Sequence, residues 1–303
     1  MTNEANGSPS PFKRLCQTSH APDYVGLVIL LTAWVMIDMF VTPFHRMFST
    51  QDLRLSFPFA EHERVSVSWN FVYALFVPLG CLVTFNILAR ASVRKHEATY
   101  LCFLVAITLT QVLVDVVKNA VGRPRPDLLA RCRPSPNAAD PRALVTIAAC
   151  TAPRDRVLED GWRSFPSGHS SFSFAGLGFL SLFLAGQLHV FNHATARRDL
   201  GRDLVCLAPL LGALLIAISR CQDYRHDVYD VTVGCAIGMA VAYWSYRRHW
   251  PPLSSPVCDE PRGPPPGLDA APGWQRVRDE EEAGIEAGVG AAGNGYPLNA
   301  RLG

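Results

Sequence analysis

The chain has 303 residues, of which 49% are hydrophobic and only 18% are charged, and its mean hydropathy is +0.13. Soluble domains carry about 25% charged residues, so this composition argues against a soluble enzyme with a charged surface. The formal net charge of +2 is too small, and the basic residues are too dispersed, to indicate a nucleic-acid partner. Long runs almost free of charge instead indicate a multi-pass membrane protein.

Six apolar runs predict transmembrane helices. In chain order they cover residues 24–44, 67–89, 98–117, 170–189, 204–219 and 228–246. The first run is too long for the core of a signal peptide and has no clear small-residue cleavage site, so we expect it to be retained. The fifth run is short for a span. The expected fold class is all-α, a polytopic membrane protein with a bundle of six transmembrane helices.

The chain divides by composition into three parts. Residues 1–23 form a polar N-terminal segment, residues 24–246 form the helical domain, and residues 247–303 form a tail rich in Pro and Gly. The tail cannot bury enough apolar surface to fold alone, so it is predicted to be disordered. An even number of spans places both chain ends on one side of the membrane. Function is therefore expected in the helical domain.

Basic residues in the short loops predict the orientation of the spans, because Lys and Arg collect on the cytosolic side. On the side of the chain ends lie Lys13, Arg14, Arg90, Arg94, Lys95, Arg197, Arg198, Arg202, Arg247 and Arg248. That side is predicted to be cytosolic. The loop 118–163 is also rich in Arg and faces the lumen or the exterior, but long loops follow the rule weakly. The sequence does not choose among vacuole, Golgi and plasma membrane.

Polar clusters stand at three helix ends, all on the face opposite the chain ends. The first contains Lys118 and Arg125, the second is Pro166-Ser167-Gly168-His169, and the third runs from Ser219 to Asp230. Ionisable side chains at the membrane border are costly, so each cluster indicates a functional site. The topology predicts that the three clusters meet.

The converging residues suit a phosphate group. Lys118, Arg125 and Arg220 supply three positive charges, and two of these are planar guanidinium groups that match paired phosphate oxygens. Gly168 lets the backbone approach a ligand closely, and the amides after Ser167 at the start of a helix form an anion site. These five residues are the predicted phosphate-binding set.

Two histidines next to this set indicate the chemistry. We assign His226 as the nucleophile and His169 as the general acid, with a phosphohistidine intermediate that water hydrolyses when His169 acts as a base. Asp230 follows His226 by four residues, so a helix that begins by His226 would place both on one face, where the carboxylate fixes the imidazole tautomer. The three cations replace the charge neutralisation that Mg²⁺ provides elsewhere, so neither a metal nor another cofactor is predicted.

The spacings match a known signature. Six residues separate Lys118 from Arg125, and five and then three residues separate Arg220, His226 and Asp230. With the segment 166–169, this pattern resembles the type 2 phosphatidic acid phosphatase superfamily, which implies a helical core shared with haloperoxidases and the residue roles given above. The segments 122–127 and 160–165 look most like those of fungal diacylglycerol pyrophosphate and phosphatidate phosphatases.

The resemblance implies a membrane enzyme that removes phosphate from phosphatidate, diacylglycerol pyrophosphate or related lipids without Mg²⁺. A prenyl (dolichyl) diphosphate phosphatase with the same chemistry is the alternative enzyme. A catalytically silent protein that binds lipid phosphates is the alternative outside enzymes, although it would be expected to lack a histidine of the signature. The partners expected are a lipid phosphate and the membrane, and the sequence indicates no protein partner. Cys132 and Cys150 share the long loop and are a candidate disulfide pair.

Overall fold

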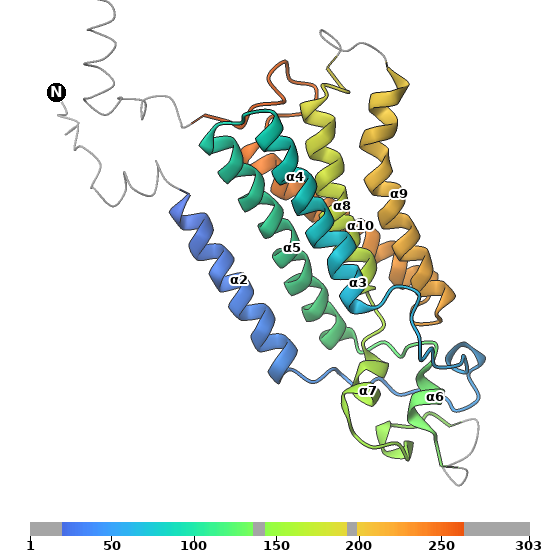
Figure 1. The fold of residues 1–303 in the computed structure, drawn as a ribbon. Coiled ribbons are helices and arrows are strands. Elements are labelled where there is room, and N and C mark those ends of the chain that lie inside the picture. Colours follow the sequence, from blue (N-terminus) through green and yellow to red (C-terminus); the bar gives the residue numbers. More distant parts are fainter. Residues whose placement is uncertain (1–19, 136–142, 193–198, 264–303) are drawn as a thin grey trace, which may run out of the picture. The chain divides into compact units, whose positions relative to one another are not determined.

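The computed structural model describes residues 20–135, 143–192 and 199–263. In this part of the chain, six helical segments are long and apolar enough to cross a membrane, and β pairing is limited to two isolated bridges. The segments are α2 (Ala21–Phe40), Val67–Leu88, α5 (Val93–Val121), α8 (Gly168–Gln187), α9 (Leu200–Gln222) and α10 (Val228–His249). The predicted all-α fold with six spans is therefore confirmed (Figure 1).

Several spans begin outside the apolar runs, because a hydropathy pattern does not detect a polar first turn. The start of α5 is capped by Ser92, whose hydroxyl accepts the amide of Lys95, and its end is the left-handed Gly122 at φ 56°. The short fifth run becomes a helix of 23 residues, because Asp199 caps a charged first turn that precedes the apolar part of α9. Both caps extend helices into the polar border of the membrane.

The second span changes its winding along its length. It consists of α3 (Val67–Phe71), a π-helical stretch (Val72–Phe76) and α4 (Val77–Leu88). Pro78 lacks the N–H that would bond to the carbonyl of Ala74 in a regular α-helix. A Cβ on Gly176 of α8 would lie only 1.7 Å from that carbonyl oxygen, so glycine is required for this close approach of two helices.

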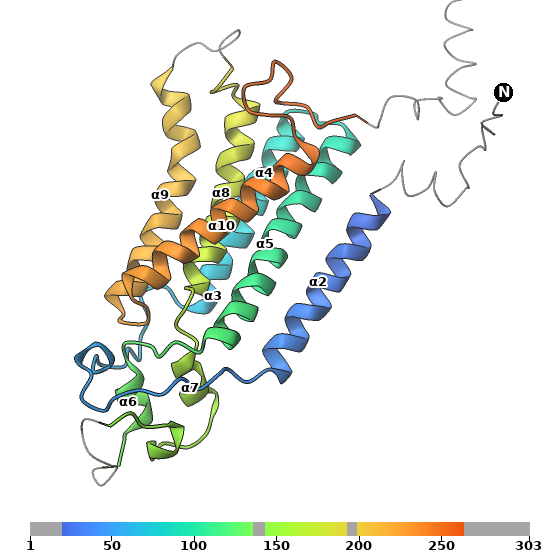
Figure 2. The same cartoon turned by 180° about the vertical axis from the view of Figure 1, so that it is seen from behind.

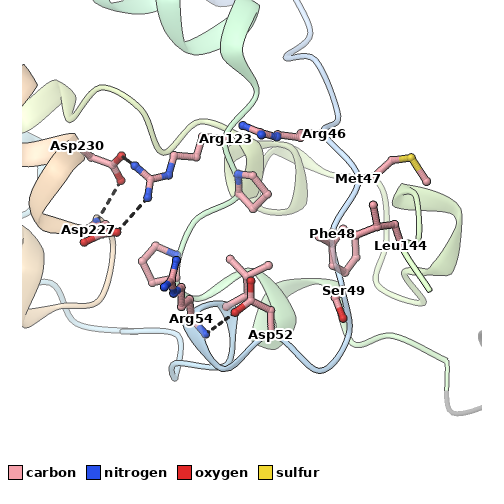
Figure 3. Close-up of a pocket in the computed structure, with 13 residues that line it drawn as sticks. Arg46, Met47, Phe48, Ser49, Asp52, Arg54, Arg123, Leu144, Asp227 and Asp230 are labelled. Carbon is pink, nitrogen blue, oxygen red and sulfur yellow. Dashed lines mark hydrogen bonds and ion pairs between the residues drawn. The ribbon is translucent and has the colours of Figure 1, made fainter. Parts of the chain in front are cut away.

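The loops on one side of the spans fold together into a small cap, which comprises residues 41–66, 122–135 and 143–167. It contains the short helices α6 (Leu128–Cys132) and α7 (Arg156–Glu159) and lies at the end of the helices that the α9–α10 loop also reaches (Figures 1 and 2). Cys132 and Cys150 form a disulfide in the cap, as the sequence suggested. The apolar centre of the cap consists of Phe48, Leu55, Leu128, Cys132, Val145, Leu158 and Trp162, part of which is visible in Figure 3.

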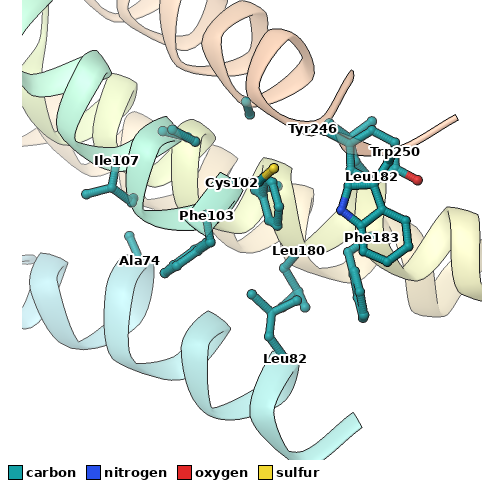
Figure 4. Packing of buried hydrophobic residues seen from close by; sticks show 14 of the residues in the cluster. Ala74, Leu82, Cys102, Phe103, Ile107, Leu180, Leu182, Phe183, Tyr246 and Trp250 are labelled. Carbon is teal, nitrogen blue, oxygen red and sulfur yellow. The ribbon is translucent and has the colours of Figure 1, made fainter. Parts of the chain in front are cut away.

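The core of the bundle is built around α8, which packs against α5, α10 and the π-helical stretch. Phe103, Phe179 and Phe183 are fully buried there, and Ala74 and Leu82 come from the second span (Figure 4). By contrast, α2 and α9 expose most of their large apolar side chains. An apolar surface of this extent suits contact with lipid chains instead of water.

The predicted tail boundary at residue 247 needs a correction. The last span continues to His249, and the following residues pack against the bundle, where Trp250 and Cys258 are completely buried. Trp250 stacks on Tyr246 and meets Phe183 edge to face. Composition is a poor guide here because two buried side chains, Trp250 and Cys258, pack an otherwise polar, Pro-rich stretch against the bundle. Residues 264–303, and residues 1–19 with Lys13 and Arg14, lie outside the described residues, so their predicted states stay predictions.

Residues Pro22–Arg262 form one compact unit. Of the described residues, 20, 21 and 263 fall outside this unit. All the features below belong to the unit Pro22–Arg262.

Candidate active site

A cavity of about 210 Å³ lies where α3, α5, α8 and α9 meet the cap. It collects residues that are far apart in the sequence, and six of the eight predicted site residues line it. These six are Lys118, Arg125, Gly168, His169, Arg220 and His226. The predicted meeting of the three polar clusters is thus present in the structure. The other two predicted residues, Ser167 and Asp230, do not line the cavity.

Ser167 serves the start of α8. Its hydroxyl oxygen accepts hydrogen bonds from the amide and the hydroxyl of Ser170, and the side chain is completely buried. The hydroxyl oxygen therefore serves as the cap of α8, and the side chain does not line the cavity. At Gly168, a Cβ would lie 2.9 Å from the ammonium nitrogen of Lys118. The end of the Lys118 side chain thus crosses the start of α8, and a larger residue at position 168 would have to displace it.

Arg125 is held rigidly by Asp160. Its Nε donates to the carbonyl oxygen of Asp160 at 2.8 Å and its Nη2 to the carboxylate at 2.9 Å, while its Nη1 lies 3.5 Å from Nε2 of His226. Burial alone would raise the pKa of Asp160, but Arg125, Arg131 and Lys118 outweigh burial and hold that pKa well below its usual range. Asp160 is therefore an anion that fixes one guanidinium edge and leaves the other toward the cavity.

Arg220 is positioned by the loop that precedes α3. Its Nη1 donates to the carboxylate of Glu63 at 3.0 Å and to the carbonyl oxygen of Val65 at 2.9 Å. Glu63 also pairs with Arg225 at 2.9 Å. The Arg220 side chain is almost fully buried, yet its Nε has no hydrogen-bond partner among the described residues. A buried unpaired donor at a cationic cavity is a group that an anionic ligand can satisfy.

The tautomer of His226 follows from its backbone partner. Nδ1 lies 2.7 Å from the carbonyl oxygen of Ser164, and a carbonyl oxygen only accepts, so Nδ1 carries the proton. The unprotonated nitrogen is therefore Nε2, on the side of the ring near Arg125. Burial, followed by the charges of Arg125 and Lys118, lowers the pKa of His226 well below its usual value. The imidazole is thus neutral at neutral pH, with a lone pair available on Nε2.

The predicted direct contact between His226 and Asp230 is not a hydrogen bond, since the nearest atoms are 3.7 Å apart. The expectation assumed a helix that begins by His226, but α10 begins at Val228 with Asp227 as its N-cap. His226 therefore precedes the helix, and a spacing of four residues does not place it on the same helical face as Asp230. Asp230 occupies the third helical position and turns back toward the helix start in a capping box.

Asp230 instead supports the segment that orients His226. Its completely buried carboxylate accepts the hydroxyl of Ser164 at 2.6 Å and Nη1 of Arg123 at 2.7 Å. It also accepts the backbone amide of Asp227 at 3.1 Å, while Arg123 donates to the Asp227 carboxylate (Figure 3). Asp230 therefore acts on His226 through Ser164, whose carbonyl oxygen holds the imidazole.

Ser164→Ala should lower kcat by about tenfold, because supporting residues of this kind typically contribute 10- to 100-fold. The substitution keeps the carbonyl group but removes the hydroxyl that anchors it to Asp230, so the His226 ring loses part of its alignment. Measuring kcat and KM separately for the substrate class that the sequence predicts, a short-chain lipid phosphate, checks this, and the change is expected in kcat. Ser245→Ala is the matched control, because the Ser245 hydroxyl is also buried and bonds a backbone carbonyl, that of Cys102, in the bundle core. A kcat for Ser164→Ala equal to that of the control would contradict the proposed support.

His169 stands at the second residue of α8 and lines the same cavity as His226. Its Nε2 is buried and has no hydrogen-bond partner among the described residues. An imidazole nitrogen without a protein partner is free to exchange a proton with a bound molecule. The two histidines thus face one small cationic cavity from different chain segments.

Sequence reasoning missed the residues that hold the cations in place. Asp160 and Glu63 line the cavity, but no role was predicted for either of them from the sequence. Asp160 only begins the segment 160–165, which carries part of the family resemblance, and Glu63 belongs to no motif. Two further arginines near the motifs, Arg131 and Arg163, do not line the cavity. Arg131 is bonded to Asp127, Asp160 and the carbonyl of Val157, and Arg163 to Asn119 and the carbonyl of Val41.

Together, the six apolar helices and this cavity define a multi-pass membrane protein with three cationic side chains and two histidines around one cavity at the end of its bundle. Comparison with known proteins agrees. The family model described as the PAP2 superfamily matches residues 99–252. The chain belongs to the PAP2 superfamily.

Curated relatives cover most of the chain. It is 43% identical over 232 residues to "Probable diacylglycerol pyrophosphate phosphatase 1" of Schizosaccharomyces pombe, which covers 76% of this chain and 81% of the relative. It is 38% identical over 265 residues to "Diacylglycerol pyrophosphate phosphatase 1" of Saccharomyces cerevisiae, and this alignment covers 84% of this chain and 90% of the relative. With "Lipid phosphate phosphatase 2" of Arabidopsis thaliana it shares 34% identity over 238 residues, 78% of this chain and 79% of the relative. No solved structure matches the chain significantly.

Proposed function

We propose that this protein is a membrane-embedded phosphatase that hydrolyses phosphatidate, diacylglycerol pyrophosphate or related lipid phosphates. The names of its relatives support this class of enzyme and substrate. The observation that carries the proposal is His226, whose unprotonated Nε2 lies beside Arg125 in a cavity that Lys118 and Arg220 also line. A neutral imidazole next to fixed cations is the arrangement that nucleophilic attack on a phosphate requires.

In the first step, Nε2 of His226 forms a bond to phosphorus while the bond from phosphorus to the leaving oxygen breaks. His169 donates a proton to that oxygen, and the product is a phosphohistidine. In the second step, His169 takes a proton from water, the water oxygen attacks phosphorus, and the P–N bond breaks to release inorganic phosphate. Together, the two steps return each histidine to its starting state.

Lys118, Arg125 and Arg220 stabilise the negative charge on the phosphoryl oxygens during both steps. Asp160 and Glu63 hold two of these cations at fixed positions, so little reorganisation is needed when charge develops. These two carboxylates line the cavity, and each is already paired with arginine. The charge neutralisation that Mg²⁺ supplies in many phosphoryl transfers is thus assigned to side chains of the chain itself.

The proposal includes an orientation. The cap with its Cys132–Cys150 disulfide is assigned to the lumenal or extracellular face, since disulfides persist in oxidising compartments. Arg90, Arg94 and Lys95 lie at the opposite end of the helices, which the distribution of basic residues assigns to the cytosol together with both chain ends.

Hydrolysis of lipid phosphates is expected to continue in excess chelator. The test measures release of inorganic phosphate by purified full-length protein in detergent micelles that contain EDTA, from a panel including phosphatidate, diacylglycerol pyrophosphate and a prenyl diphosphate. We expect EDTA to change the rate by less than about twofold, because the three cations replace the metal. Activity that appears only after Mg²⁺ is added would refute the mechanism. Preference for the prenyl diphosphate would favour the alternative enzyme, and binding without turnover would favour a silent lipid-phosphate-binding protein.

A further inference from the structure

The catalytic cavity has a second wall that the phosphate chemistry does not use. Asn70 of α3 and Gln111 of α5 line it together with the apolar side chains of Val67, Phe71 and Phe172. Gln111 precedes Lys118 by seven residues on α5, a rise of about 10 Å toward the membrane interior. This wall therefore lies at the depth where the part of a lipid next to its phosphate would enter.

The two carboxamides on this wall are incompletely paired. The side-chain oxygen atoms of Asn70 and Gln111 are buried and have no hydrogen-bond partner among the described residues. Only 6% of the Asn70 surface is exposed. Buried polar atoms are nearly always hydrogen-bonded, because an unpaired one is costly. Water in the cavity can pair with these groups, so a substrate that displaces the water must pair with them instead.

A carboxamide offers both kinds of hydrogen bond. Its NH₂ group donates to carbonyl oxygens, its oxygen accepts from hydroxyl groups, and rotation of the last side-chain bond exchanges the two. The glycerol part of a lipid phosphate carries ester carbonyl and hydroxyl oxygens within a few bonds of phosphorus. An alkyl or prenyl monophosphate carries only carbon and hydrogen there.

We propose that Asn70 and Gln111 bind the oxygen atoms of the leaving group next to the scissile phosphate, and that they select phosphorylated lipids with an oxygen-rich backbone over those with a plain hydrocarbon chain. The inference rests on the proposed phosphatase function. Selection arises because a site built to hydrogen-bond a substrate disfavours an analogue that leaves the site unpaired. Lys118, Arg125 and Arg220 make no such distinction, since they contact the phosphate group, which both kinds of substrate share.

The test compares kcat/KM for two single-chain monophosphates, palmitoyl lysophosphatidate and hexadecyl phosphate, in the same detergent micelles. For the wild-type protein we expect a preference for lysophosphatidate of about tenfold or more. Asn70→Leu and Gln111→Met replace each carboxamide with an apolar group of similar size. Each should reduce the preference severalfold by slowing lysophosphatidate, with hexadecyl phosphate hydrolysed as fast as before or faster.

Asn86→Leu is the matched control. Asn86 of α4 is completely buried and its side-chain oxygen also lacks a hydrogen-bond partner among the described residues, but it does not line the cavity. The control should keep the wild-type preference. Inorganic phosphate has no leaving group, so it binds only to Lys118, Arg125 and Arg220. Its inhibition constant should therefore be the same in the Asn70 and Gln111 variants as in the wild-type protein.

Two results would overturn the inference. One is a preference that stays at the wild-type value in both cavity variants, and the other is an equal loss toward both substrates, which a merely structural role would cause. If a variant no longer hydrolyses hexadecyl phosphate, Asn70→Ala or Gln111→Ala replaces it in the same comparison. Failure of the underlying function is distinguishable, because then the wild-type protein would release phosphate from neither substrate.

Discussion

His226→Ala is expected to lower kcat for lipid phosphate hydrolysis by about a thousandfold or more, as removal of a catalytic nucleophile does in other enzymes that act through covalent intermediates. The tautomer of His226, set by the carbonyl of Ser164, leaves Nε2 as the attacking atom, and the alanine variant has no group to replace it. The three cations remain, so the variant should still bind the substrate. The loss is therefore expected in kcat, with a much smaller change in KM.

The measurement combines steady-state rates with trapping of the covalent intermediate. A lipid with a radiolabelled phosphate is mixed with the protein and quenched in alkali, where phosphohistidine survives, and protein-bound label is counted. Wild-type protein should carry label, and His226→Ala should carry none. His96→Ala is the control, because His96 bonds Tyr100 at the opposite end of α5 from Lys118. Label that persists in His226→Ala, or turnover close to that of the control, would exclude His226 as the nucleophile.

Arg125→Lys is expected to lower kcat/KM by about a hundredfold, although the positive charge is kept. The guanidinium makes two directed bonds to Asp160 and still presents Nη1 beside His226. A lysine ammonium is a single point of charge and cannot hold Asp160 in this way while reaching the phosphate oxygens. The variant should also lose inhibition by inorganic phosphate, because both ligands use the same cation.

Arg156→Lys provides the matched control for this exchange. Arg156 begins α7 in the cap, its side chain is largely exposed, and it pairs with Asp38. Exposed ion pairs contribute little, so the control should keep wild-type rates. If Arg125→Lys stays within about threefold of the control, a rigid guanidinium at this position is not part of the phosphate site.

Local patterns in the sequence predicted the six spans, and they predicted residues of which six line one cavity in the structure. Twenty apolar residues must form a helix in a bilayer, whatever the neighbours are, so hydropathy alone located six spans. The spacing from Lys118 to Arg125 and from Arg220 to His226 indicated which helix ends carry the site. Contacts within the polar clusters were harder to predict, because a difference of two residues in a helix start changes which side chains meet.

Asp230 illustrates that difficulty. Its spacing from His226 suggested a direct bond, but the capping box at Asp227 starts the helix later and directs Asp230 to Ser164 instead. Glu63 and Asp160 show a second reason for failure. Both residues come from the cap, whose fold depends on a disulfide and a small apolar cluster. No periodic pattern in the sequence predicts this cluster.

The amino-acid sequence by itself determined the six helical spans and the helix ends at which the histidines and three cationic residues stand, because the length of an apolar run and the spacing of a motif are local properties. The tertiary structure decided which groups hold Arg125, Arg220 and His226, that Trp250 and Cys258 are buried beyond the end of α10, and that Asn70 and Gln111 share the cavity. These contacts depend on the packing of segments that are distant in sequence. A hydrogen bond needs its donor and acceptor within about 3 Å of each other, and only the folded chain brings distant residues that close.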